Sequence, residues 1–138
     1  MKYIGTGVTL SASEAWRSMA SLIGHWSLRG YGFWAVEEKS SGKLIGRVGI
    51  WNPHGWPGIE VGWTLVKSSW GNGYATEAAL AAIDWGFANI NTDELISLII
   101  PENAASIRVS ERIGQSFKET GRMMDLDVNI YSIRKEKG

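Results

Sequence analysis

The N-terminal part of the chain carries an apolar stripe at helical spacing. Between residues 11 and 30, apolar side chains recur three and four positions apart, a period that predicts an amphipathic helix. Ser11 and Glu14 have the spacing of a capping box, and Gly30 is typical of the end of a helix. The stripe consists of Trp16, Met19, Ala20, Ile23 and Trp26.

Three strand-like segments follow this helix. Residues 33–38 and 44–51 flank the turn sequence KSSGK, which predicts a hairpin. Residues 59–66 follow a loop rich in Pro and Gly, and their side chains alternate as those of a strand with two different faces do. One face would carry Ile59, Val61, Trp63 and Leu65, and the other Glu60, Gly62, Thr64 and Val66.

The second half of the chain alternates helices and strands. Residues 75–89 are dominated by Ala, Leu, Ile, Trp and Phe, which predicts a helix with a wide buried face. Residues 94–100 are almost continuously apolar, as is typical of a central strand covered on both sides. A short helix over residues 103–114 and a last strand over residues 126–134 complete the prediction.

The predicted order is helix, three strands, helix, strand, helix, strand. An antiparallel meander should therefore come first, followed by a right-handed parallel crossover. This order indicates an α/β (α+β) fold with a mixed, mostly antiparallel central sheet flanked by helices. The 138 residues fit a single domain, residues 1–138.

Composition excludes several classes of function. The 14 basic and 14 acidic residues balance, which argues against a nucleic-acid partner. The absence of cysteine excludes disulfides, thiolate metal sites and a cysteine nucleophile, and two histidines are too few for a zinc site. No segment approaches membrane-spanning length, so we expect a cytoplasmic protein without a membrane partner. The 8 Trp residues could fill a core or line a groove.

The sequence WGNGYATEAA, residues 70–79, places two glycines directly before a predicted helix. The first N–H groups of a helix have no partner within it and lie at the positive end of its dipole. Glycines permit positive φ and close approach of a ligand, so the segment predicts a phosphate or pyrophosphate site. Thr76 could add a hydroxyl contact. A plain tight turn before a helix is the alternative.

Two familiar nucleotide motifs do not match this segment. The Walker pattern requires a Lys after its last glycine, and none follows Gly73. The dinucleotide pattern requires a third glycine where Thr76 stands, within a βαβ unit rather than after an antiparallel meander. The phosphate ligand must therefore belong to another class.

The combined pattern resembles the GNAT superfamily of acyl-CoA-dependent N-acetyltransferases. Within it, the closest resemblance is to the Rim-type branch, which acetylates ribosomal-protein N-termini and related amines. The resemblance rests on residues 59–87, on NAASIRVSERIG (residues 103–114) and on the terminal strand sequence NIYSI. Residues 68–73 fit the family's loop pattern Q/R-x-x-G-x-G/A, except that Ser68 replaces Gln or Arg. The resemblance implies the GNAT fold and acetyl-CoA as co-substrate.

The resemblance also implies which residues bind CoA. Backbone N–H groups from Trp70 to Ala75 would bind the pyrophosphate, Leu65 and Val66 would bind the pantetheine, and Ser106 would lie near the thiol. Arg108 would either reach the 3′-phosphate or remain a solvated helix residue. The full expected set is Leu65, Val66, Ser68, Trp70, Gly71, Asn72, Gly73, Tyr74, Ala75, Thr76, Asn103 and Ser106.

The implied reaction is direct transfer of an acetyl group to a primary amine in a ternary complex. Such an amine must lose a proton, and burial of Glu60 on its strand would raise its pKa and suit it as the base. An ion pair between Glu60 and Arg47 on the neighbouring strand is the alternative. A backbone N–H near Val66 would stabilise the oxyanion. The Tyr that many relatives use as the general acid is replaced here by Ser110. Ser106 is therefore the first candidate for the general acid, and Tyr131 is the second.

The chain also departs from the family at its start. Relatives usually begin with a strand and a helix that are absent here, so residues 33–38 would form a sheet edge and the acceptor groove would be open or rebuilt. Exposed aromatic residues there would favour a homodimer. Two other functions remain open: a CoA-binding protein without transferase activity, and a Trp-rich module that binds a small ligand.

Overall fold

The computed structural model describes residues 11–136, and it confirms the predicted elements with two additions, a 3₁₀ helix at Lys67–Ser69 and a strand at Ser116–Met123. Each predicted boundary lies within two residues of the observed one. The elements are α1 (Ala12–Arg29), β1 (Phe33–Glu37), β2 (Leu44–Trp51), β3 (Glu60–Leu65), the 3₁₀ helix η1 (Lys67–Ser69), α2 (Tyr74–Asn89), β4 (Glu94–Ile99), α3 (Ala104–Arg112), β5 (Ser116–Met123) and β6 (Leu126–Arg134).

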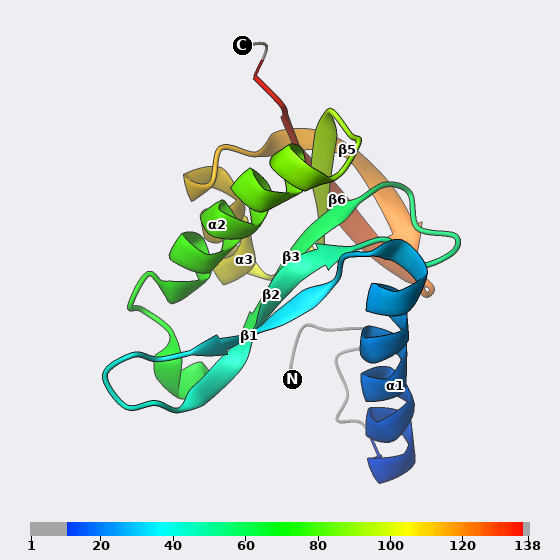
Figure 1. The fold of residues 1–138 in the computed structure, drawn as a ribbon. Coiled ribbons are helices and arrows are strands. Elements are labelled where there is room, and N and C mark those ends of the chain that lie inside the picture. Colours follow the sequence, from blue (N-terminus) through cyan, green and yellow to red (C-terminus); the bar gives the residue numbers. More distant parts are fainter. Residues whose placement is uncertain (1–10, 137–138) are drawn as a thin grey trace.

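The strands form one mixed sheet of six, in the order β1-β2-β3-β4-β6-β5. Only β3 and β4 are parallel, and α2 is the crossover that joins them. The other neighbouring pairs are antiparallel, and β1 is an edge strand as expected. Helices α2 and α3 cover one face of the sheet, and α1 lies against the other (Figure 1). The chain therefore has the α/β architecture expected from its sequence.

The main core lies between the sheet and α2. Its buried members come chiefly from β2, β3, β4 and α2, and include Val48, Ile50, Val61, Ala79, Ala82, Ile83 and Leu95. Trp26, Trp34 and Trp85 pack edge to face beside it, with ring centroids between 5.0 and 6.4 Å apart. Part of the unusual Trp content is therefore packing, as large aromatic side chains in a small domain usually are.

Helix α1 is capped as predicted, but its apolar stripe faces outward except at Trp26. The Ser11–Glu14 capping box and the left-handed Gly30 bound the helix. Trp16, Met19 and Ile23 are 72 %, 62 % and 66 % exposed, whereas the polar side of α1 faces the sheet. The helix is held by His25, whose Nδ1–H donates to the Tyr31 carbonyl and whose Nε2 accepts from Asn52 N–H. No helix within residues 11–136 has the length and apolarity needed to cross a membrane.

Strand β5 is the one strand of the sheet that the sequence pattern did not predict. It pairs with β6 from Ser116 to Met123 and forms the second edge of the sheet. Six of its eight side chains are exposed, and Phe117 is 55 % exposed. Because neither face of the strand is buried, its side chains show no alternation, and the register comes from β6 alone.

Replacing Gly49 with Ala is expected to lower the free energy of unfolding by about 3 kcal/mol, because a buried side chain would have no room. A Cβ at Gly49 would lie against the Gly32 carbonyl oxygen and the Phe33 Cα, both rigid backbone atoms. Gly24→Ala is the matched control, since nothing lies within 4 Å of a Cβ there and Ala favours helix. Urea unfolding measures both variants. Equal stability of the Gly49 variant and the unsubstituted protein would contradict the packing described.

Candidate active site

Strands β3 and β4 separate soon after they meet. Glu60 and Ile96 are the one paired position of the two strands, although both continue for several residues. Beyond it, Ser97 Oγ donates to the Val61 carbonyl at 2.6 Å. Because backbone groups of alternate residues point to opposite sides of a strand, the Trp63 and Leu65 N–H groups face the gap that opens toward β4.

The Val66 backbone is not available to a ligand, which corrects the sequence prediction. Its N–H donates to the Ile45 carbonyl at 2.8 Å, and its carbonyl accepts from Ser69 N–H at 2.9 Å. The Leu65 carbonyl accepts from the Trp70 indole at 3.0 Å. The free donors at this strand end are therefore the N–H groups of Trp63 and Leu65, because an antiparallel ladder uses every second residue of a strand.

The glycine turn leaves a row of backbone N–H groups without acceptors. Gly71 and Gly73 have φ of +84° and +74°, and nothing lies within 4 Å of a Cβ built on either. Gly73 is the N-cap of α2 and supplies no side-chain cap. Among the described residues, no hydrogen bond is formed by the backbone N–H groups from residue 71 to residue 76. An uncapped helix start of this kind favours an anion.

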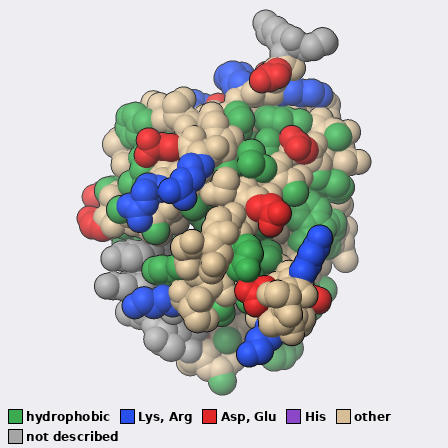
Figure 2. Space-filling model, turned by 90° about the vertical axis from the view of Figure 1, so that its left-hand side faces the viewer, with side chains coloured by type: hydrophobic (Ala, Val, Ile, Leu, Met, Phe, Trp, Pro, Cys, Tyr) green, Lys and Arg blue, Asp and Glu red, His purple; other side chains and the backbone are tan. Residues whose placement is uncertain are grey.

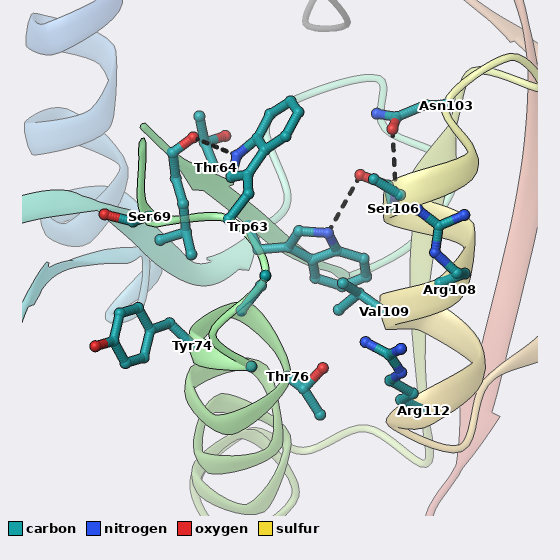
Figure 3. Close-up of a pocket in the computed structure, with 16 residues that line it drawn as sticks. Trp63, Thr64, Ser69, Tyr74, Thr76, Asn103, Ser106, Arg108, Val109 and Arg112 are labelled. Carbon is teal, nitrogen blue, oxygen red and sulfur yellow. Dashed lines mark hydrogen bonds between the residues drawn. The ribbon is translucent and has the colours of Figure 1, made fainter. Parts of the chain in front are cut away.

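A cavity of about 410 Å³ joins the glycine turn to the gap between β3 and β4. Its walls are the end of β3, the turn, the first residues of α2 and one side of α3 (Figure 3). Arg108 and Arg112 of α3 line the cavity and add positive charge, and in Figure 3 Arg112 extends from α3 toward Thr76. Figure 2 shows basic side chains interspersed with acidic ones on this side of the molecule.

Most of the predicted cofactor residues line this cavity. They are Leu65, Trp70, Gly71, Gly73, Tyr74, Ala75, Thr76, Asn103 and Ser106. Val66, Ser68 and Asn72 do not line it; the Asn72 side chain instead donates to the Ser69 carbonyl at 3.1 Å. The prediction missed Trp63, Thr64, Ser69, Ala105, Val109 and Arg112, and it left Arg108 open. For Arg108 and Arg112, the sequence signal that could have predicted their place in the cavity was their i, i+4 spacing, which puts both on the same face of one helix.

The start of α3 positions the polar groups at the inner end of the cavity. The Asn103 side chain caps α3 by accepting from Ser106 N–H at 3.2 Å. Ser106 Oγ accepts from the Trp63 indole at 3.3 Å, which leaves the hydroxyl proton free to be donated elsewhere. The cap and the indole together fix the Ser106 hydroxyl across from the open edge of β3 (Figure 3).

A second cavity, of about 640 Å³, lies on the opposite face of the sheet under α1. Aromatic side chains from β1, β2, β3 and the loop after β2 line it, together with one end of the β5–β6 hairpin. It shares Trp63, Thr64, Asn103 and Ser106 with the first cavity. The two cavities therefore meet where β3 and β4 separate, which brings a ligand in one within reach of a ligand in the other.

Glu60 is the half-buried acid of the second cavity. Its Oε1 accepts from the Trp56 indole at 3.0 Å and its Oε2 from Leu98 N–H at 2.8 Å. Burial raises the pKa of Glu60 to about 7, although both hydrogen bonds act in the other direction. Among the described residues Glu60 has no ion-pair partner, and Arg47 lies opposite Thr64 instead. The alternative Glu60–Arg47 pair is therefore absent.

Two other predicted positions lie outside the site. Tyr131 lines neither cavity; it is buried and packs edge to face against Phe117 with centroids 5.9 Å apart. It therefore has no access to a thiol at the inner end of the first cavity. Ser110, which stands where the family places its Tyr, is fully buried and donates to Gln115 Oε1 at 2.7 Å.

Comparison with known proteins gives the family of this architecture. Residues 1–116 match the model of the acetyltransferase (GNAT) domain. The chain belongs to the GNAT acetyltransferase family. A curated relative of this GNAT domain is YkkB of Bacillus subtilis, which is 37 % identical over 107 residues. The match covers 75 % of this chain and 62 % of YkkB, so the chain spans less than two thirds of that relative.

Solved structures agree with this assignment. An acetyltransferase from Agrobacterium tumefaciens superposes on the GNAT domain with a TM-score of 0.85 at 31 % identity, covering 95 % of this chain and 77 % of that one. The protein yncA of Salmonella typhimurium, solved with its cofactor acetyl-CoA, has a TM-score of 0.73 at 18 % identity, with coverages of 99 % and 80 %. At this level of identity, the similarity to yncA shows a shared fold.

Proposed function

We propose that this GNAT domain transfers the acetyl group of acetyl-CoA to a primary amine in a ternary complex. The proposal rests on one observation, which is that the glycine turn and the two cavities form a continuous path. A row of free N–H groups at the start of α2 leads through the first cavity to the Ser106 hydroxyl, where the second cavity, which holds Glu60, begins. Phosphate, thioester and amine would occupy this path in that order.

The residues of the first cavity fit CoA. The open space over Gly71 and Gly73, which a Cβ would fill, leaves room for phosphate oxygens against the free N–H groups. Arg108 and Arg112 add the charge that phosphates require. The open edge of β3 offers the Leu65 N–H to an amide of the pantetheine arm. The naming of acetyl-CoA as cofactor in the yncA structure supports the same assignment.

Three groups of this chain would perform the transfer. Acetyl-CoA, when bound, supplies an acetyl thioester. Glu60 accepts the proton that the attacking amine loses, directly or through a water molecule. The free N–H of Trp63 or Leu65 donates to the carbonyl oxygen on which charge develops. Ser106 donates a hydrogen bond to the sulfur, which leaves as the CoA thiolate when the C–S bond breaks after the new C–N bond has formed, and the proton taken up by Glu60 then balances the thiolate charge.

Replacing Ser106 with Ala is expected to lower kcat by about tenfold, because the departing thiolate loses its donor. Acetyl-CoA affinity should change little, since the Asn103 cap accepts from the backbone N–H, which remains. Single-turnover kinetics with calorimetry separates the two effects. Ser116→Ala, at an exposed position on β5, is the control. An unchanged kcat would remove Ser106 from the mechanism.

The experiment that tests the proposal has two arms. Calorimetry with acetyl-CoA asks whether the first cavity binds the co-substrate, and thiol release over a panel of amines asks whether transfer occurs. Binding with transfer supports the proposal. Binding without transfer to any amine would leave a CoA-binding protein, and no binding would overturn both. Membership of the Rim-type branch and a homodimer are proposals of the same kind.

A further inference from the structure

We infer that the amine acceptor carries a carboxylate next to its amine, so that the substrate class is a free α-amino acid with an apolar side chain. The inference rests on the proposed function and names the acceptor of the same site. It comes from the charged groups that face the second cavity, which are Glu14 and Arg17 of α1, Arg47 of β2 and Glu60 of β3.

Both carboxylates in this cavity are already hydrogen-bonded within the protein. Glu60 accepts from the Trp56 indole and from Leu98 N–H. Glu14 closes the capping box of α1 by accepting from Ser11 N–H at 3.3 Å. Neither acid forms a salt bridge among the described residues. Among the described residues, neither carboxylate is therefore paired with Arg17 or Arg47 of the same cavity.

Both arginines, in contrast, lack an acceptor in the described part of the chain. Within residues 11–136 neither Arg17, which is exposed, nor the half-buried Arg47 takes part in a hydrogen bond or an ion pair, and Arg47 Nε is buried without a hydrogen-bond partner. Burial lowers the pKa of Arg47 from its usual range, but a guanidinium remains charged at neutral pH. A half-buried guanidinium without a counter-ion is costly, and a bidentate carboxylate ligand would offset that cost.

Arg47 is also placed close to the expected point of reaction. It lies directly opposite Thr64 in the β2–β3 register, and Thr64 lines both cavities. Its guanidinium lies over the Phe33 ring, 5.2 Å from the centroid, which orients the group. A carboxylate bound by Arg47 would thus hold an amine one carbon away within the cavity that also contains Glu60. An acceptor whose amine is far from its carboxylate could not bind Arg47 and bring its amine to the reaction site at the same time.

The rest of the cavity suits an apolar side chain. Its wall includes Trp51, Trp56, Leu98, Met123 and Val128. The volume of about 640 Å³ is that of a pocket for a small molecule rather than for an extended peptide. A peptide N-terminus would also bring an amide where the arginine requires an anion. The pocket therefore favours a free amino acid over a protein N-terminus.

The test compares acceptors that differ only in the carboxylate. Thiol release from acetyl-CoA is measured with L-phenylalanine, L-phenylalanine amide and phenethylamine, and with L-leucine, its amide and 3-methylbutylamine. We expect kcat/KM to be at least about 30-fold higher for the amino acids. Arg47→Met should raise KM for L-phenylalanine by about tenfold or more and leave phenethylamine unchanged. A merely structural role of Arg47 would affect both acceptors alike.

Matched variants and a binding measurement separate this inference from the proposed transfer. Arg134→Met, on the surface outside both cavities, should change neither acceptor, and thermal unfolding confirms that the Arg47 variant is folded. Quenching of Trp fluorescence by N-acetyl-L-phenylalanine, against N-acetylphenethylamine, reports carboxylate binding without turnover. Binding that depends on both carboxylate and Arg47 supports the inference even if no amine is acetylated. Equal use of phenethylamine, or equal loss of both acceptors in Arg47→Met, overturns it and leaves the transfer proposal standing.

Discussion

Replacing Glu60 with Gln is expected to lower kcat/KM for acetyl transfer by about 100-fold or more, the usual effect of losing a general base. The amide keeps the shape of the side chain and can accept one of the two hydrogen bonds, but it cannot take a proton. Acetyl-CoA affinity should not change, because Glu60 lies outside the first cavity. Glu111→Gln, at an exposed position on α3, is the control and should be fully active.

The pH profile gives a second measurement of the same role. Because burial raises the pKa of Glu60 to about 7, kcat/KM should fall as the pH drops through 7. The Glu60→Gln variant should lose this inflection and keep only the ionisation of the acceptor amine. A profile that is the same in both proteins would mean that another group, or bulk water, accepts the proton.

Glu60 also links folding to pH, with the opposite sign from an ordinary paired carboxylate. Its folded pKa is above the value of 4.5 that is usual for Glu, so the folded state binds an extra proton between those two values. Stability contributed by this proton is present at low pH and is lost as the pH rises from about 4.5 to about 7. Melting temperatures over this range should fall less steeply for Glu60→Gln than for the unsubstituted protein.

Replacing either Gly71 or Gly73 with Val is expected to weaken acetyl-CoA binding by about 100-fold or more, measured by calorimetry. A β-branched residue is strained at positive φ, and its side chain would occupy the space over the free N–H groups. Removing several backbone contacts to phosphate at once costs more than losing a single hydrogen bond. Affinity equal to that of the unsubstituted protein would show that the turn is only structural.

The control for the glycine variants is Gly30→Val. Gly30 has φ of +79° and the same open surroundings, but it ends α1 and lines neither cavity. It should lose a similar amount of stability through backbone strain and keep its acetyl-CoA affinity. The acetyl-CoA affinities of the three glycine variants are compared at equal distances below their melting temperatures. This comparison isolates the contribution of the glycine turn to acetyl-CoA binding.

Local signals in the sequence predicted much of the fold. The capping box at Ser11 and Glu14, the glycine turn before α2 and the apolar run of β4 each depend on neighbours in the chain, and each was confirmed. The sequence pattern did not predict β5, because no interaction between neighbouring residues distinguishes this segment. The strand is stabilised mainly by its pairing with β6. The α1 stripe was recognised, but which way it faces depends on where His25 and Trp26 attach the helix.

The candidate site likewise has features that the sequence predicted and features that only the structure shows. The sequence alone predicted the α/β class, the glycine turn at residues 70–76 and Glu60 as a strand carboxylate, since each follows from spacing and residue type within a few positions. Only the tertiary structure decided that the Val66 N–H is already used, that Tyr131 lies away from the cavities and that Arg47 lines the second cavity with no hydrogen-bond or ion-pair partner in the described part of the chain. Hydrogen-bond partners, burial and counter-ions come from strands and helices far apart in the chain, and folding alone brings them together.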